Sequence, residues 1–315
     1  MPELITLGET MVCFTPENNE PLQYAHTFEK RIAGAESNVA IAAARLGHSS
    51  GWISKLGNDP FGSYIKNTIR GEGVDVSGVR IHSQNPTGLM FKQICESCES
   101  VITYYRQNSA ASTLTPSDLD PVYFRGCRIF HTTGINSAIS QSAHETVKAA
   151  IQAAKAAGCM VSFDPNVRLK LCTRQKIRGL LLEIIRYSDI LLLGLDEAEI
   201  LFDTREPEEI FLRVFGLGVR FIGLKMGDQG AYAADPENSF FCPTFPARKV
   251  DSIGAGDAFN AGFLTGLLEG RSLEDCGLYG SAMGAMAVMS KGDFENLPDR
   301  NGLESFLSGS LLITR

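Results

Sequence analysis

The chain has 315 residues, of which 44% are hydrophobic, 21% charged and 9% aromatic. These fractions exclude collagen-like, disordered and disulfide-scaffold proteins, and the length fits two domains or one large α/β domain with an insertion. The 36 Asp and Glu outnumber the 29 Lys and Arg and give a net charge of −7, which disfavours nonspecific binding to nucleic acid or anionic lipid. An anionic substrate therefore needs a locally basic pocket.

The sequence carries no membrane or export signal that we can identify. No run approaches the ~20 apolar residues of a membrane span, and the opening Met1–Ile5 has neither the basic nor the apolar region of a secretory signal. The eight cysteines are scattered, as is typical of reduced thiols. Cys95 and Cys98 form a CxxC without a second half for a zinc site, so we interpret it as loop or strand. We expect a cytoplasmic protein with no membrane or nucleic-acid partner.

In chain order, short apolar runs alternate with stretches of helical periodicity. Apolar runs of about four to eight residues are typical of strands buried on both faces of a parallel sheet. We predict such strands at 4–7, 128–131, 160–163, 190–193 and 219–224, and helices at 144–157, 175–187 and 258–268. The alternation predicts an α/β fold with a doubly wound, mostly parallel sheet.

Residues 10–32 and 85–110 break this alternation. Both segments are rich in Thr, Tyr, Phe and Ile and lack a helical period, and Val101–Tyr105 is wholly β-branched or aromatic. We interpret them as a small β-sheet that projects from the main domain. We expect it to act as a lid that moves when substrate binds, and its outer face to pair with a second subunit in a homodimer.

Residues 251–259 read Asp-Ser-Ile-Gly-Ala-Gly-Asp-Ala-Phe and lead into the helix predicted at 258–268. The small residues Gly254, Ala255 and Gly256 thus lie at a helix N-terminus, where backbone N–H groups and the helix dipole favour an anion. Asp257 in the first turn has two interpretations. It either complements the helix dipole, or it faces the anion site and accepts a proton from a hydroxyl nucleophile.

The longer string resembles the C-terminal signature of the ribokinase-like (PfkB) carbohydrate kinases. Residues 34–40, 46–47 and 57–62 resemble the N-terminal signature of the same family, in the expected order, so the resemblance covers nearly the whole chain. It implies a single domain over 1–315 with a ribokinase-like three-layer sandwich, a mostly parallel central sheet and a small β-sheet lid. It also implies ATP and Mg²⁺ as cofactors and phosphoryl transfer to a sugar hydroxyl.

The resemblance also implies roles for single residues. It makes Asp257 the base that takes the hydroxyl proton, and residues 254–256 the anion hole. It implies that Gly34 and Asn38 contact the sugar, whereas the residues alone suggest a tight turn at Gly34 and a helix start at Asn38. One departure from the family is Ala33-Gly34, where Gly-Gly is usual.

Residues 8–11, 104–112 and 163–171 resemble the 2-keto-3-deoxygluconate kinases within this family. The resemblance implies that the site for the sugar acid and the phosphate is lined by Tyr104, Tyr105, Arg106, Asn166 and Arg168. An acid substrate needs local cations, and the planar fork of Arg binds carboxylate or phosphate bidentately. Arg168 also follows a predicted strand, at the edge where open α/β sheets bind ligands. We therefore expect phosphorylation of 2-keto-3-deoxy-D-gluconate to its 6-phosphate.

The expected nucleotide site rests on two further segments. Residues 224–231, with Lys225, Gly227 and Gly230, resemble the ATP-binding turn of the family, although the residues alone also fit an ordinary hairpin. Residues 279–285 match the helix that usually presents an Asn to adenine, and here Ser281 replaces that Asn. Asn166, Arg168 and the glycines at 254 and 256 complete the expected nucleotide contacts.

The metal site is inferred from an altered motif. The family's Asn-x-x-Glu becomes Gly194-Leu195-Asp196-Glu197 in this chain. We expect Glu197 to act on Mg²⁺ through water, because this ion tends to keep its hydration shell. A monovalent cation such as K⁺ near Asp251 and Ser252 is a further expectation from the resemblance.

The sequence alone leaves three alternative functions open. Another sugar kinase of the family, such as a fructokinase, would use Arg168 for the nucleotide phosphates alone. A catalytically inactive sugar-binding protein is disfavoured by the retention of Asp257 and the full Gly-Ala-Gly string. A Rossmann dehydrogenase would carry Gly-x-Gly-x-x-Gly after its first strand, where this chain has Gly-Glu-Thr-Met at 8–11.

Overall fold

A computed structural model describes residues 1–18, 20–94, 100–251, 253–289 and 292–309. Within these ranges nine strands form one large sheet in the order β13-β12-β11-β10-β9-β8-β1-β4-β5. The seven strands from β11 to β5 pair in parallel, and β12 and β13 add an antiparallel edge. Their bounds are β1 Leu4–Leu7, β4 Ser50–Gly57, β5 Val79–His82, β8 Ile129–Thr133, β9 Met160–Asp164, β10 Ile190–Gly194, β11 Phe221–Lys225, β12 Ala231–Ala234 and β13 Ser239–Cys242.

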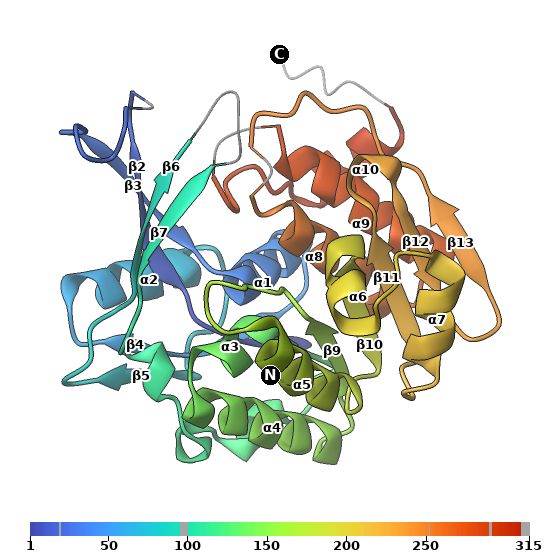
Figure 1. The fold of residues 1–315 in the computed structure, drawn as a ribbon, viewed down its shortest axis with the longest axis horizontal. Helices are drawn as coiled ribbons and strands as arrows, with labels where there is room; N and C mark the ends of the chain where they lie inside the picture. Colours follow the sequence, from blue (N-terminus) through green and yellow to red (C-terminus); the bar gives the residue numbers. More distant parts are fainter. Residues whose placement is uncertain (19, 95–99, 252, 290–291, 310–315) are drawn as a thin grey trace.

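Helices cover both faces of this sheet (Figure 1). Successive residues of a strand point to opposite faces, so Leu192 packs in one apolar core and Leu191 in the other. One core is built with α1 (Ala35–Arg45), α2 (Pro60–Gly71), α8 (Ala255–Leu268), α9 (Leu273–Ala287) and α10 (Arg300–Leu307). The other is built with α4 (Gln141–Ala156), α5 (Arg174–Ile185), α6 (Leu195–Phe202) and α7 (Pro207–Phe215), and α3 (Gly134–Ile139) precedes α4. The three-layer α/β architecture predicted from the sequence is confirmed.

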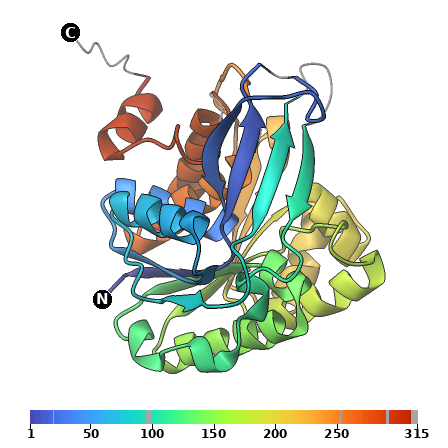
Figure 2. The same cartoon turned by 90° about the vertical axis from the view of Figure 1, so that its left-hand side faces the viewer.

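A second, four-stranded sheet in the order β3-β2-β6-β7 confirms the small sheet predicted from 10–32 and 85–110. Its strands are β2 Met11–Pro16, β3 Phe28–Ala33, β6 Leu89–Gln93 and β7 Val101–Tyr105. Figure 2 shows these strands standing upright above the main body. One face of the sheet carries the buried cluster of Met11, Cys13, Ala33 and Met90, and the other carries contacting aromatic rings. We call this element the lid sheet.

The predicted strands and helices agree with the observed ones to within a few residues. The prediction omitted β4, β5 and the β12–β13 hairpin, because β4 contains two glycines and a lysine and the other strands have four residues each. Within the described residues, no helix is long and apolar enough to cross a membrane. The CxxC cysteines Cys95 and Cys98 lie outside the described residues.

Candidate active site

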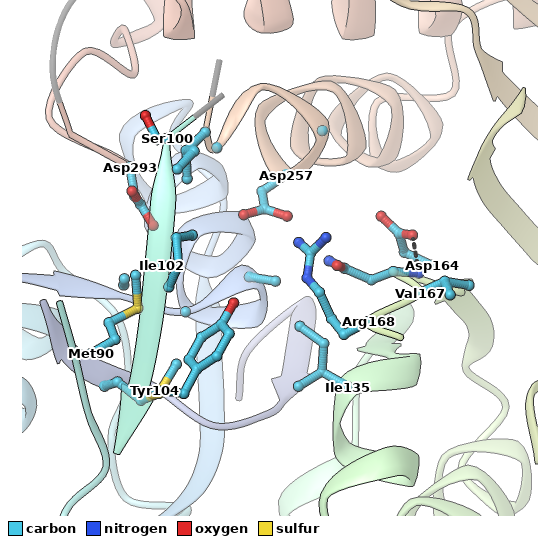
Figure 3. A pocket seen from close by; sticks show the side chains of 18 of the residues that line it. Met90, Ser100, Ile102, Tyr104, Ile135, Asp164, Val167, Arg168, Asp257 and Asp293 are labelled. Carbon is cyan, nitrogen blue, oxygen red and sulfur yellow. Dashed lines mark hydrogen bonds between the residues drawn. The ribbon is translucent and has the colours of Figure 1, made fainter. Parts of the chain in front are cut away.

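A cavity of about 1030 Å³ lies where the carboxyl ends of the parallel strands meet the lid sheet and the start of α8 (Figure 3). The residues that line it come from widely separated segments. Strand ends and the loops after them supply Asp164, Asn166, Arg168, Glu197 and Lys225, and the turn into α8 supplies Gly254, Gly256 and Asp257. Open α/β sheets bind ligands at this edge, so the cavity is the candidate active site.

The start of α8 is shaped to receive an anion. Gly254, the residue before the first helical one, has a left-handed backbone with φ +84°, and a Cβ there would lie 2.5 Å from the carbonyl oxygen of Asp293. Glycine is therefore required at this position. The ammonium of Lys225 lies 3.7 Å from the place where a Cβ of Gly256 would stand. A helix N-terminus next to a fixed cation favours a phosphate group.

Asp257 projects from the first turn of α8 into the cavity, and its side chain and that of Arg168 point toward one another (Figure 3). Its Oδ2 accepts a hydrogen bond of 2.9 Å from the amide of Asn38 on α1. Burial raises the pKa of Asp257 to about 6, helped by the charge of Asp164 and opposed by Asn38, Lys225 and Arg168. A carboxylate with this pKa is ionised at neutral pH and is well matched to general-base work.

If Asp257 is the base, kcat/KM for the sugar should fall below pH 6, because protonation removes the acceptor for the hydroxyl proton. The expected decrease is about tenfold per pH unit at lower pH. It is measured as initial rates from pH 5 to 8 with saturating ATP. Burial also raises the pKa of Asp293, to about 7, so the variant Asp293→Asn is the control. Asp293→Asn should keep the acid limb, whereas a profile flat to pH 5 would contradict the assignment.

A hydrogen-bonded cluster fixes Lys225 beneath the phosphate position. Its Nζ lies 2.8 Å from Oδ2 of Asp164, which also accepts a bond of 2.6 Å from the amide of Asn260. Burial alone would lower the pKa of Lys225, but the carboxylates of Asp164 and Glu197 outweigh burial and raise it. The ammonium therefore stays charged. Our sequence analysis gave no role to Asp164 or Asn260, although an Asp directly after a predicted strand was a usable signal.

Glu197 lines the cavity at the start of α6. Its Oε2 accepts a bond of 2.8 Å from the backbone N–H of Gly194, and its Oε1 one of 2.9 Å from that of Val167. Burial and the charge of Asp164 raise its pKa. Among the described residues no three His, Cys, Asp or Glu side chains cluster as metal ligands. The role of Glu197 toward a metal ion stays a prediction.

The two predicted arginines differ in their surroundings. Arg106, 8% exposed, is paired with the buried carboxylate of Glu9, and the buried Nε of Arg106 has no hydrogen-bond partner among the residues that the structure describes. Both residues line the cavity. Arg168 lines it as well and forms no ion pair with any residue in the described ranges. Glu9 was missed by the sequence analysis, because nothing in a sequence links it to an arginine so distant in the chain.

Of the four other predicted sugar contacts, two do not line the cavity. Tyr104 and Gly34 line the cavity, whereas Asn38 lies behind it and bonds to Asp257. The prediction for Tyr105 is wrong: its side chain is 63% exposed and packs against Phe91 on the outer face of the lid sheet. Neighbouring residues of a strand point to opposite faces, so Tyr104 and Tyr105 cannot both face the cavity.

The expected nucleotide contacts are only partly brought together. Asn166 and Lys225 line the cavity, and Asn166 has a left-handed backbone with φ 38°. Gly227 and Gly230 lie outside its lining, in the turn of an antiparallel β11–β12 hairpin. Ser281 lies on α9, also outside the lining. The hairpin interpretation of 224–231 thus describes the local structure.

The sequence pattern of the pfkB family of carbohydrate kinases matches residues 1–300. The chain therefore belongs to this family of phosphotransferases. It is similar to the 2-dehydro-3-deoxygluconokinase of Bacillus subtilis, with 39% identity over 97% of this chain and 95% of that one. The enzyme of the same name from Thermoproteus tenax is 35% identical over 98% of this chain and 94% of that one.

A solved structure shares this fold over nearly the whole chain. An E. coli protein determined in complex with ATP and Mg²⁺ superimposes with a TM-score of 0.92 and 26% identity, over 98% of this chain and all of that one. The fold class and the kinase class expected from the sequence are both confirmed.

Proposed function

We propose that the protein is an ATP-dependent kinase that phosphorylates 2-keto-3-deoxy-D-gluconate on its 6-hydroxyl group. The observation that carries the proposal is a cavity with two guanidinium groups, Arg106 and Arg168, in addition to the anion site at α8. One cationic region suits a phosphoryl group, and a second suits a substrate carboxylate. The names of the two bacterial and archaeal relatives support the same substrate.

In the proposed reaction, Asp257 removes the proton from the sugar hydroxyl as that oxygen attacks the γ-phosphorus of ATP. The bond from this phosphorus to the β,γ-bridging oxygen breaks, and ADP leaves. The backbone N–H groups at 254–256 and the ammonium of Lys225 hold the charge that develops on the transferred phosphoryl oxygens. Bound ATP would supply the phosphoryl group, and bound Mg²⁺ would neutralise part of its charge. Glu197 would hold the metal through water, and Asn166, Gly227, Gly230 and Ser281 are the proposed contacts for the rest of the nucleotide.

The monovalent cation expected near Asp251 is left out of this proposal. The carboxylate of Asp251 is paired with the ammonium of Lys92, so a cation is already present at that position. Ser252, the other residue of that expectation, lies outside the described residues.

We also propose that the protein is a homodimer that associates through the outer face of the lid sheet. Tyr105 and Val101 on this face are 63% and 50% exposed. Sedimentation velocity should give about twice the 34.2 kDa mass of one chain. Tyr105→Arg should shift the protein to the monomer, because a charge in an apolar interface costs desolvation. Leu212→Arg, at a residue on α7 that is 76% exposed and lies away from the lid sheet, is the control. A wild-type monomer at micromolar concentration would contradict the dimer.

The reaction itself is tested by product analysis. The protein is incubated with 2-keto-3-deoxygluconate, ATP and MgCl₂, and the products are followed by ³¹P NMR. The proposal predicts one phosphomonoester signal, coupled to the two protons on C6, and one ADP per ester. ADP and inorganic phosphate without an ester would contradict it.

A further inference from the structure

A buried ion pair joins the lid sheet to the segment that leads into α8. Lys92 lies on lid strand β6, and its Nζ contacts Oδ2 of Asp251. The side chain of each residue is only 4% exposed. The ion pair therefore connects the lid sheet to the residues that lead into the anion site at 254–256. It is not part of the phosphoryl-transfer chemistry described above.

Asp251 in turn shapes the approach to the anion site. Its Oδ1 accepts a hydrogen bond of 3.2 Å from the backbone N–H of Ile253, the residue before Gly254. The backbone N–H of Val250 and that of Asp251 both donate to the carbonyl of Val288 after α9. Asp251 therefore fixes the turn from which the N–H groups at 254–256 project.

A second carboxyl group, that of Asp293, lines the same small cavity as Lys92 and Asp251. Burial raises the pKa of Asp293, and the ammonium of Lys92 opposes that increase. The carbonyl of Asp293 lies against Gly254, close enough to forbid a Cβ there. One ammonium from the lid thus acts on both segments that enclose the start of α8.

A small cavity of about 20 Å³ adjoins the pair, lined in part by Thr15, Lys92, Asp251 and Asp293. A volume of roughly this size holds one water molecule. Replacing Lys92 with Ala would enlarge this cavity enough to admit a small cation such as NH₄⁺. An added cation can then be tested as a substitute for the missing ammonium.

We propose that Lys92 is a positioning residue: its ammonium holds Asp251 so that the anion site at 254–256 is complete only when the lid sheet is docked. This inference rests on the proposed phosphoryl transfer at that site. If Lys92 is removed, Asp251 loses its cation, and a buried carboxylate without a partner is strongly unfavourable. The turn then shifts, and the N–H groups no longer converge on the phosphoryl group.

The test compares Lys92→Ala with Lys30→Ala, a control on lid strand β3 whose side chain lies over Tyr64 on the outside. Lys92→Ala should lower kcat by about 10- to 100-fold, the size expected for a displacement of roughly 1 Å. It should also weaken ADP binding by calorimetry while the KM for sugar changes little. Lys30→Ala should match wild type in all three measurements.

Rescue separates positioning from general damage to the fold. NH₄⁺ or K⁺ should restore at least part of kcat and ADP affinity to Lys92→Ala, and choline at equal ionic strength should not. Wild type should be indifferent to all three cations. Lys92→Met and Asp251→Asn should each lower the melting temperature. The double variant Lys92→Met/Asp251→Asn, which removes both charges of the pair, should recover it without recovering kcat.

Four outcomes would overturn the inference: Lys92→Ala within twofold of wild type, no rescue by NH₄⁺ or K⁺, activation of wild type by K⁺, or full activity in the double variant. Failure of the proposed function would be distinct, because wild type would then make no sugar phosphate. ADP affinity and melting temperature would still report on Lys92.

Discussion

Asp257→Asn is expected to lower kcat by about 10²–10⁴-fold, the usual loss when a general base is removed. The amide keeps the size of the side chain, but it cannot take the proton of the sugar hydroxyl. Asn38, which now donates to Oδ2 of Asp257, can still donate to the amide oxygen of the variant. Sugar binding should therefore persist. Turnover is measured with both substrates saturating, and sugar affinity by calorimetry.

Asp299→Asn is the matched control for this variant. Asp299 is also a carboxylate at a helix N-terminus, where its Oδ1 accepts a bond of 2.8 Å from the backbone N–H of Gly302. It lies outside the cavity lining, and Asn caps a helix nearly as well as Asp, so kcat should not change. If Asp257→Asn keeps more than half of the wild-type kcat, Asp257 merely complements the helix dipole.

Arg106→Ala is expected to lower kcat/KM for 2-keto-3-deoxygluconate by about 10- to 150-fold and to affect fructose far less. Hydrogen bonds to a charged group are worth about 1.5–3 kcal/mol, and each 1.4 kcal/mol is about tenfold. Arg106 lines the cavity on the side of the lid sheet, where Glu9 pairs with it and holds its guanidinium in place for a substrate carboxylate. Initial rates with both sugars and saturating ATP measure the difference.

Arg168→Ala serves as the comparison, and it should slow both sugars. Arg168 points toward Asp257 (Figure 3), and its charge lowers the pKa of that group. Equal losses with the two sugars for Arg106→Ala would contradict its role with the carboxylate. Arg106 would then hold the lid in shape through Glu9, and only the similarity to named relatives would support an acid substrate.

The local patterns in the sequence predicted much of the fold and the centre of the site. Buried strands such as 190–193 appear in the sequence as continuous apolar runs. The glycines before Asp257 predict a helix N-terminus whose backbone N–H groups favour an anion. The lid sheet was predictable because its β-branched and aromatic residues do not repeat with a helical period. Side chains of a strand alternate between its two faces, so the predicted strand at 101–105 also places Tyr104 and Tyr105 on opposite faces.

Pairings between distant segments were beyond this kind of prediction. Arg106 was expected to meet the substrate directly, but the fold brings Glu9 to it. Lys92 meets Asp251 in the same way, between the lid sheet and the segment that leads into α8. Burial decides such pairings, because a charge removed from water must find a partner wherever the fold provides one. A local sequence pattern does not contain that information.

The central claim, that this sugar kinase acts on a keto-deoxy sugar acid, is tested most directly by a substrate panel on the wild-type protein. We would measure kcat/KM with 2-keto-3-deoxygluconate, fructose, ribose and gluconate under saturating ATP and MgCl₂. The account predicts that 2-keto-3-deoxygluconate exceeds each of the others by more than about tenfold, the ratio that 1.4 kcal/mol of selective binding provides. A kcat/KM for fructose or ribose equal to or above that for 2-keto-3-deoxygluconate would contradict it.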